Sequence, residues 1–183
     1  MKARAEATIE DLYLVPDNGR AELVNGELVL LLPTGDLPSS ATGAIYVSLR
    51  LYEGHAPSGR AYTATAGFIV NLPNRKSFSP DVAFYVGPRS GGKFLNGAPV
   101  FAVEVRSEGD YGPKAERAIA AKRADYFSAG TLVVWDVDVL RDEVVRVYRA
   151  SDPGNPAIYH RGEVAEAEPA VPGWQMPVDE LFT

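Results

Sequence analysis

The chain of 183 residues contains no cysteine, only two histidines and no long apolar run. The lack of cysteine excludes a disulfide framework, a thiolate nucleophile and a cysteine-ligated zinc site. No window approaches the roughly eighteen consecutive apolar residues of a membrane span, and residues 1–10 carry no apolar core of a secretory signal. We therefore expect a cytoplasmic protein that does not enter a membrane.

The composition is that of a globular protein, with 46% hydrophobic and 23% charged residues. The length is typical of one domain, so we expect residues 1–183 to form a single domain. The formal net charge of −6 is unlike that of a typical DNA-binding domain. The charge is uneven, however: residues 89–123 carry a net +3 and the rest of the chain −9, which leaves room for a local basic face.

The apolar pattern predicts an α/β (α+β) fold. Asn25-Gly26 between two apolar runs is a strong hairpin signal, and Pro113 suits the first position of a long helix that Gly130 ends. A mixed sheet flanked by helices is expected. The predicted helices cover 9–15, about 41–54 after a loop at 33–40, and 113–129; the predicted strands cover 60–65, 67–72, 81–86, 100–105, 131–137 and 143–149, before a tail of loops and short strands.

Two acidic residues lie at the ends of otherwise apolar strands. Asp81 opens the run that continues Val-Ala-Phe-Tyr-Val, and Glu104 lies near the end of residues 100–105. A carboxylate in such a strand is costly unless it is paired or binds a cation. Two acids on neighbouring strands can converge on one hard cation, which prefers oxygen ligands.

A lysine lies on the helix that follows these strands. The stripe of this helix that should face the sheet contains Lys122 and, one turn later, Tyr126. A lysine on that surface requires a partner, and the strand acids are the obvious candidates. Two carboxylates and a lysine suit phosphodiester hydrolysis, in which a metal activates water and a cation stabilises the developing charge.

These motifs, in this order, resemble the Uma-type putative restriction endonuclease family of the PD-(D/E)XK nuclease superfamily. The resemblance covers nearly the whole chain. It includes a Glu-Leu-Val-Asn-Gly-Glu-Leu hairpin from Glu22, a Pro-Asp pair at Asp81, the Val-Glu-Val-Arg-Ser segment around Glu104, and a Lys-x-x-x-Tyr helix from Lys122. The chain ends with Pro172-Gly173 and Glu-Leu-Phe, as family members do.

The resemblance implies a restriction-endonuclease-like core, DNA as the partner and Mg²⁺ as the cofactor, with Mn²⁺ as a substitute. It implies Asp81 and Glu104 as metal ligands, with the backbone carbonyl of Val105 as a third. The superfamily lysine normally lies two residues after the acid, where this chain has Arg106, and Lys122 on the helix takes that role. Glu22 would be a supporting acid. The chain departs from the family at Ser40-Ala41-Thr42-Gly43, where a histidine is frequent, and at Ala118, where an aspartate is frequent.

We expect phosphate contacts from basic residues of the +3 segment, namely Lys93, Arg106, Lys114 and Arg117. Each of the four acid and lysine candidates also has a structural explanation when taken alone: a proline turn for Asp81, an ion pair for Glu104, a lysine reaching water for Lys122 and a solvated hairpin for Glu22. One shared site explains all four together.

Two other functions stay open at this stage. One is a non-catalytic protein with a nuclease fold that binds nucleic acid or a protein partner. The other is a metal-dependent hydrolase of RNA or nucleotides, which the −9 remainder of the chain favours. The sequence neither indicates nor excludes a homodimer.

Overall fold

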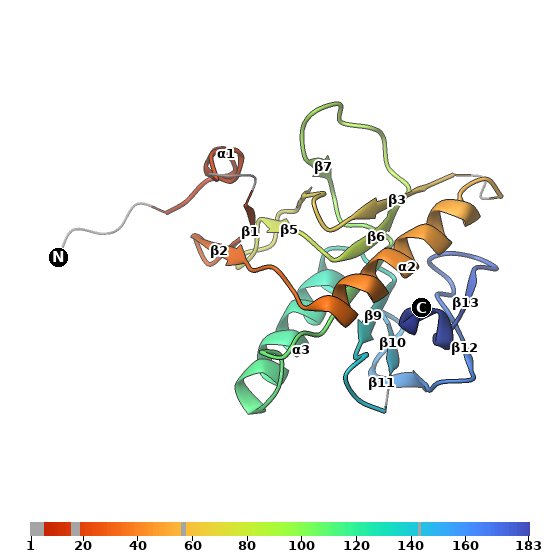
Figure 1. The fold of residues 1–183 in the computed structure, drawn as a ribbon. Coiled ribbons are helices and arrows are strands. Elements are labelled where there is room, and N and C mark those ends of the chain that lie inside the picture. The colour runs from red at the N-terminus through yellow and green to blue at the C-terminus, as the bar shows by residue number, and fades with distance from the viewer. Residues whose placement is uncertain (1–5, 16–18, 56–57, 143) are drawn as a thin grey trace.

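A mixed six-stranded sheet forms the centre of the computed structural model, which describes residues 6–15, 19–55, 58–142 and 144–183 (Figure 1). The strand order is β11-β10-β9-β8-β6-β3, and only β8 and β9 are parallel among these neighbours. The strands are β3 (Arg60–Thr63), β6 (Val82–Tyr85), β8 (Phe101–Val105), β9 (Val133–Val137), β10 (Val145–Arg149) and β11 (Asp152–Tyr159).

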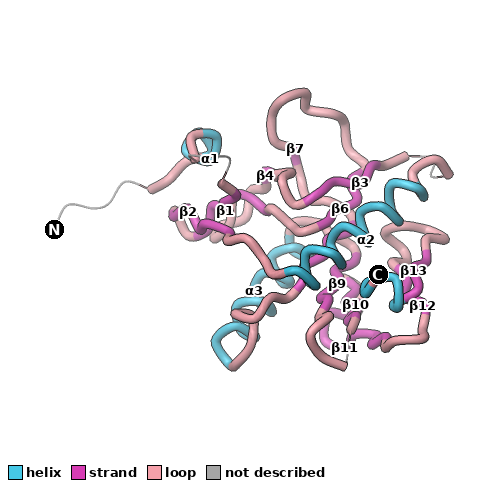
Figure 2. Tube along the Cα trace, in the orientation of Figure 1, coloured by secondary structure: helices cyan, strands magenta, loops and turns pink. Residues whose placement is uncertain are grey.

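Helices cover the two faces of this sheet (Figures 1 and 2). One face packs against α2 (Asp36–Tyr52), β12 (Val164–Glu166), β13 (Gln175–Pro177) and η2 (Val178–Phe182). The other packs against α3 (Pro113–Ser128) and a small sheet of β4 (Phe68–Ile69), β5 (Ser77–Phe78) and β7 (Leu95–Asn96).

Alternation along β8 assigns each of its side chains to one face. Phe101, Val103 and Val105 lie in the core beneath α2, whereas Ala102 lies in the core beneath α3. Glu104 follows the same alternation as Ala102 and therefore points to the α3 face. The parallel pairing of β8 with β9, joined by the crossover helix α3, holds this helix against that face.

A hairpin of β1 (Arg20–Val24) and β2 (Glu27–Leu31) projects from the body next to α1 (Ile9–Tyr13), as Figure 1 shows. Asn25 and Gly26 form its turn with φ of 50° and 73°. This left-handed pair is what a two-residue hairpin turn requires, and Asn-Gly adopts it readily. The amide of Leu23 donates to Ser77 Oγ at 2.8 Å, which fixes β1 beside β5.

The predicted helices and main strands occur in the expected order. The strand expected at 67–72 is only the two-residue β4, and the short strands β5 and β7 were not predicted. Helix α2 begins at Asp36, inside the stretch expected to be a loop, because Pro38 lies in the first turn, where a proline is tolerated. The tail contributes an eight-residue strand, β11, rather than loops and short strands alone. Pro153 and Pro156 are compatible with it because β11 is an edge strand of the sheet. Among the described residues, no helix is both long and apolar enough to cross a bilayer.

Candidate active site

The four acid and lysine residues singled out from the sequence come from four elements. Glu22 lies on β1, Asp81 directly precedes β6, Glu104 lies on β8 and Lys122 lies on α3. The backbone fixes the position of Asp81: its amide donates to the carbonyl of Val103 at 3.0 Å, and its Oδ2 accepts from the amide of Val105 at 2.9 Å. The Asp81 carboxylate is thereby held against the end of the strand that carries Glu104.

Lys122 bridges two carboxylates. Its Nζ lies 2.8 Å from Glu104 Oε2 and 2.9 Å from Glu22 Oε1. Burial alone would lower the pKa of the lysine, but the two carboxylates outweigh this effect and raise it above its ordinary value. Lys122 therefore remains a cation inside the fold.

Glu22 is the most buried acid of the site. Its Oε2 accepts from Arg75 Nη1 at 2.5 Å, and its Oε1 accepts from the amide of Ser79 at 2.9 Å. Burial acts to raise the pKa of Glu22, but Lys122 and Arg75 prevail, and the pKa lies below its ordinary value. Arg75 in turn donates from Nε to Asp125 Oδ2 at 2.8 Å, so this ion-pair chain ties the hairpin to α3.

Glu104 behaves differently from Glu22. Its side chain is 26% exposed, and its Oε1 accepts from the hydroxyl of Tyr126 at 2.6 Å. Burial of the carboxyl group, with the repulsion of Asp81 and Glu22, outweighs the attraction of Lys122 and raises the pKa of Glu104 to about 7. A further cation beside this group would relieve the repulsion.

Asp81 is about as exposed as Glu104, the other candidate metal ligand. Its Oδ1 lies 3.4 Å from both terminal nitrogens of Arg20, and its side chain is 23% exposed. Arg20 also donates to the carbonyl of Ser79 at 2.8 Å. The aspartate thus faces the solvent-accessible side of the site, with one long contact to a cation.

The donor set suits a hard divalent cation. Asp81, Glu104 and the carbonyl of Val105 supply oxygen atoms only, and Mg²⁺ is commonly held by one or two carboxylates while it keeps several waters. Within the described parts of the chain, no group of three or more His, Cys, Asp or Glu side chains is arranged to hold a metal. A zinc site, which needs three or four such ligands, does not fit these residues.

The four basic residues expected to contact phosphate are not equivalent. Lys93, Lys114 and Arg117 have exposed side chains. Arg106 is buried: its Nε lies 2.6 Å from Asp136 Oδ1, and its Nη2 lies 3.0 Å from a carboxylate oxygen of Glu116. Because its guanidinium is taken up by two acids, Arg106 is not placed to bind phosphate, and that expectation is wrong.

Sequence reasoning missed several residues of the site. The sequence placed Tyr126 on the sheet-facing stripe but gave it no role in the site, whereas its hydroxyl donates to Glu104. Its spacing four residues after Lys122 puts both on one side of the helix. Arg75 lies in a segment that reads as a turn, and nothing in the local sequence indicates that it is buried. Arg20 and Ser79 enter the site only because β1 packs beside β5.

Comparisons with known proteins agree with this architecture. The Uma2 family, described as a putative restriction endonuclease family, matches residues 7–179. No curated protein matches the chain significantly. A solved structure described as a nuclease, putative and belonging to DUF820, from Anabaena variabilis ATCC 29413, superposes with a TM-score of 0.74 at 15% identity, covering 96% of this chain and 97% of its own. At that identity the likeness shows a shared fold. The family match extends over nearly the whole sequence, and the chain therefore belongs to the Uma2 family.

Proposed function

We propose that this chain is a metal-dependent endodeoxyribonuclease that hydrolyses phosphodiester bonds with Mg²⁺, for which Mn²⁺ can substitute. The observation that supports the proposal is that Asp81, Glu104 and Lys122, which come from three parts of the chain, meet where β6 begins and the neighbouring strand β8 ends. Asp81, Glu104 and the Val105 carbonyl are the proposed metal ligands. When bound, the metal would activate water and neutralise charge on the phosphate.

The chain's own residues supply the rest of the chemistry. Lys122 is cationic and adjacent to Glu104, so it can orient the attacking water and stabilise the negative charge of the transition state. Glu22 holds Lys122 from the other side and, being fixed by Arg75 and Ser79, keeps the ammonium group in place. Tyr126 restrains one oxygen of Glu104 and leaves the other to Lys122.

Exposed cations near the start of α3 favour a nucleic-acid substrate. Lys114 and Arg117 lie on its first two turns, and Lys93 lies on the loop before β7. The acidic remainder of the chain gives one reason to consider a second candidate, a metal-dependent hydrolase of RNA or nucleotides, because a short or single-stranded substrate needs fewer cationic contacts.

The test is calorimetric titration of Mg²⁺ and Mn²⁺, combined with a nicking assay on supercoiled plasmid. Asp81→Asn preserves the shape of the side chain and an acceptor for the Val105 amide but removes the charge. The matched control is Asp152→Asn, an exposed aspartate on the far edge strand β11. We expect metal binding and nicking by the wild type and the control, and loss of both in Asp81→Asn.

Two other results are informative. If the wild type binds no metal, the catalytic proposal is wrong and the non-catalytic binding protein becomes the better reading. If metal binds and RNA or nucleotides are hydrolysed while plasmid is not, the second candidate function replaces the first.

A further inference from the structure

Helix α2 presents an uncharged face to solvent. Residues 37–49 contain no Asp, Glu, Lys or Arg. The outward side chains Leu37, Val47 and Leu51 are 43%, 55% and 72% exposed. A surface helix normally carries charged residues on its solvent side, with its apolar residues in the core. The inward side of α2 already fills the core, so this second apolar face is not explained by the fold of one chain.

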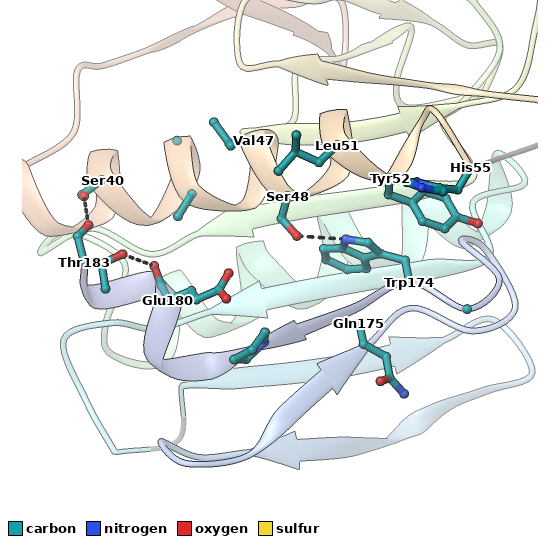
Figure 3. A pocket seen from close by; sticks show the side chains of 14 residues that line it. Ser40, Val47, Ser48, Leu51, Tyr52, His55, Trp174, Gln175, Glu180 and Thr183 are labelled. Carbon is teal, nitrogen blue, oxygen red and sulfur yellow. Dashed lines mark hydrogen bonds between the residues drawn. The ribbon is translucent and has the colours of Figure 1, made fainter.

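A groove runs along this face (Figure 3). It has a volume of about 810 Å³ and lies between α2 and the C-terminal segment, with Val47, Leu51 and Tyr52 on one side and Trp174 and Pro177 on the other. Its charged and titratable lining is confined to the ends. Glu180 lies near the start of α2, and His55 lies beyond the end of the helix, as Figure 3 shows.

Gly43 lies at the centre of the exposed face. A Cβ built on this residue would meet nothing within 4 Å. Glycine in the middle of a helix is less favourable than alanine, so a glycine without local crowding has no structural benefit within one chain. A glycine at this position would instead allow close approach of a second backbone, which a larger side chain would hinder.

We propose that a second copy of this chain docks on the groove, with α2 packed antiparallel against the partner's α2 around a two-fold axis near Gly43. The charges of the helix support this occupant. Asp36 and Arg50 are the only charged residues of α2 and lie at its opposite ends. Arg50 also pairs with Glu53, just after the helix, but its side chain is 52% exposed and keeps further donors for a second carboxylate. Antiparallel pairing centred on Gly43 and Ala44 brings Asp36 against Arg50 of the partner subunit, twice per dimer, because a two-fold interface repeats each contact.

The two polar side chains at the ends of the groove would also meet. Glu180 lies near the helix start and His55 beyond its end, so the two-fold operation turns the Glu180 end of one groove toward the His55 end of the other. Leu51 likewise comes to lie against Leu37 of the partner subunit, which covers the two large apolar side chains that flank the exposed face.

The proposed interface is separate from the metal site. Helix α2 covers the face of the sheet that carries Val103 and Val105, whereas Glu104 points to the α3 face. The inference does not rest on the proposed nuclease function. Metal titration of the same variants therefore shows whether a loss of association has disturbed the site.

The test is sedimentation equilibrium of the full chain from micromolar to submillimolar concentration. Leu51→Glu places a charge at the proposed interface, and Leu14→Glu on the segment after α1 is the matched control, since Leu14 is 74% exposed. We expect a wild-type dimer, a rise of the dissociation constant of about 100-fold or more in Leu51→Glu, and no change in Leu14→Glu. Circular dichroism confirms that both variants fold.

A charge exchange identifies the antiparallel arrangement. Asp36→Lys and Arg50→Glu, each made in a Glu53→Gln background so that position 50 has no acidic neighbour, should each raise the dissociation constant about tenfold, and the double variant should recover most of the loss. Gly43→Ala should raise the melting temperature of the monomer and at the same time weaken dimerisation. A role of Gly43 within one chain alone would not change these two quantities in opposite directions.

Three outcomes would overturn the proposal. They are a wild type that stays monomeric at every concentration, a dimer that Leu51→Glu leaves intact, and single charge variants that the double variant does not rescue.

Discussion

Replacing Tyr126 by phenylalanine removes one hydroxyl group from the site and leaves its packing intact. The ring of Tyr126 stacks on Phe78 with centroids 4.0 Å apart, and phenylalanine retains this contact without creating a cavity. The variant loses a single hydrogen bond, the one donated at 2.6 Å to Glu104 Oε1. The effect therefore isolates the restraint that Tyr126 places on Glu104.

The expected cost follows from the character of the acceptor. Above the Glu104 pKa of about 7 the acceptor is ionised, and a hydrogen bond to a charged group contributes about 1.5–3 kcal/mol to stability. Glu104 is 26% exposed, so water can replace part of the lost contact, and the lower end of that range, about 1.5 kcal/mol, applies. For a chain of this length, about 1.5 kcal/mol corresponds to a fall of roughly 3–6 °C in the melting temperature.

Equilibrium unfolding in urea measures this change, with a lower midpoint at an unchanged slope. The matched control is Tyr85→Phe, which removes a hydroxyl that donates at 2.6 Å to the neutral backbone carbonyl of Asn96. We expect a loss of about 1 kcal/mol in the control with unchanged metal affinity. In Tyr126→Phe we expect weaker Mg²⁺ binding and slower nicking, because one oxygen of Glu104 is no longer held. Equal metal affinity and equal nicking in the two variants would refute the reasoning.

Three further predictions follow from the site. Arg106→Met should destabilise the fold by about 3–5 kcal/mol in urea, because it strands the buried carboxylate of Asp136, and unchanged stability would refute this assignment. Lys114→Ala and Arg117→Ala should instead preserve stability and each lower the slope of log Kd for DNA against log salt by about 1, whereas unchanged slopes would exclude phosphate contacts. Mg²⁺ affinity should fall as the pH drops below the Glu104 pKa of about 7, since protons compete for the carboxylate, and a pH-independent affinity from pH 5 to 8 would contradict that pKa.

The raised pKa of Glu104 also makes the free energy of unfolding depend on pH. Between the ordinary pKa of 4.5 and the folded value of about 7, the native state binds more protons at Glu104 than the unfolded state. The contribution of this residue to stability therefore decreases as the pH rises through that window. Glu104→Gln should remove this component, which urea titrations at several pH values measure.

The sequence predicted the residues whose local pattern is unusual. An acid at the end of an apolar strand, as at Asp81 and Glu104, and a lysine in the core-facing stripe of a helix, as at Lys122, are costly without a partner, and the structure brings these groups together. The hairpin turn and the long helix were predicted for similar reasons, because Asn-Gly and a helix-initiating proline have specific backbone geometries.

The residues that were missed or misassigned depend on strand order instead. Arg106, directly after β8, forms an ion pair with Asp136 on β9. No local sequence pattern shows that β8 and β9 are neighbours in the sheet. Arg75 lies just before β5, and it is buried because β1 packs beside β5 and brings Glu22 within hydrogen-bonding distance. Pairings between distant segments decide both cases, and periodicity along the chain contains no information about them.

Lys122 lies on α3 and not on β8, the strand that carries Glu104. The site is therefore complete only after α3 has packed against the sheet. Its four residues are spread from position 22 to position 122 on four separately placed elements. A nascent or partly folded chain, in which α3 has not docked on the sheet, does not contain the constellation. The constellation therefore forms only when these four elements have come together in the native fold.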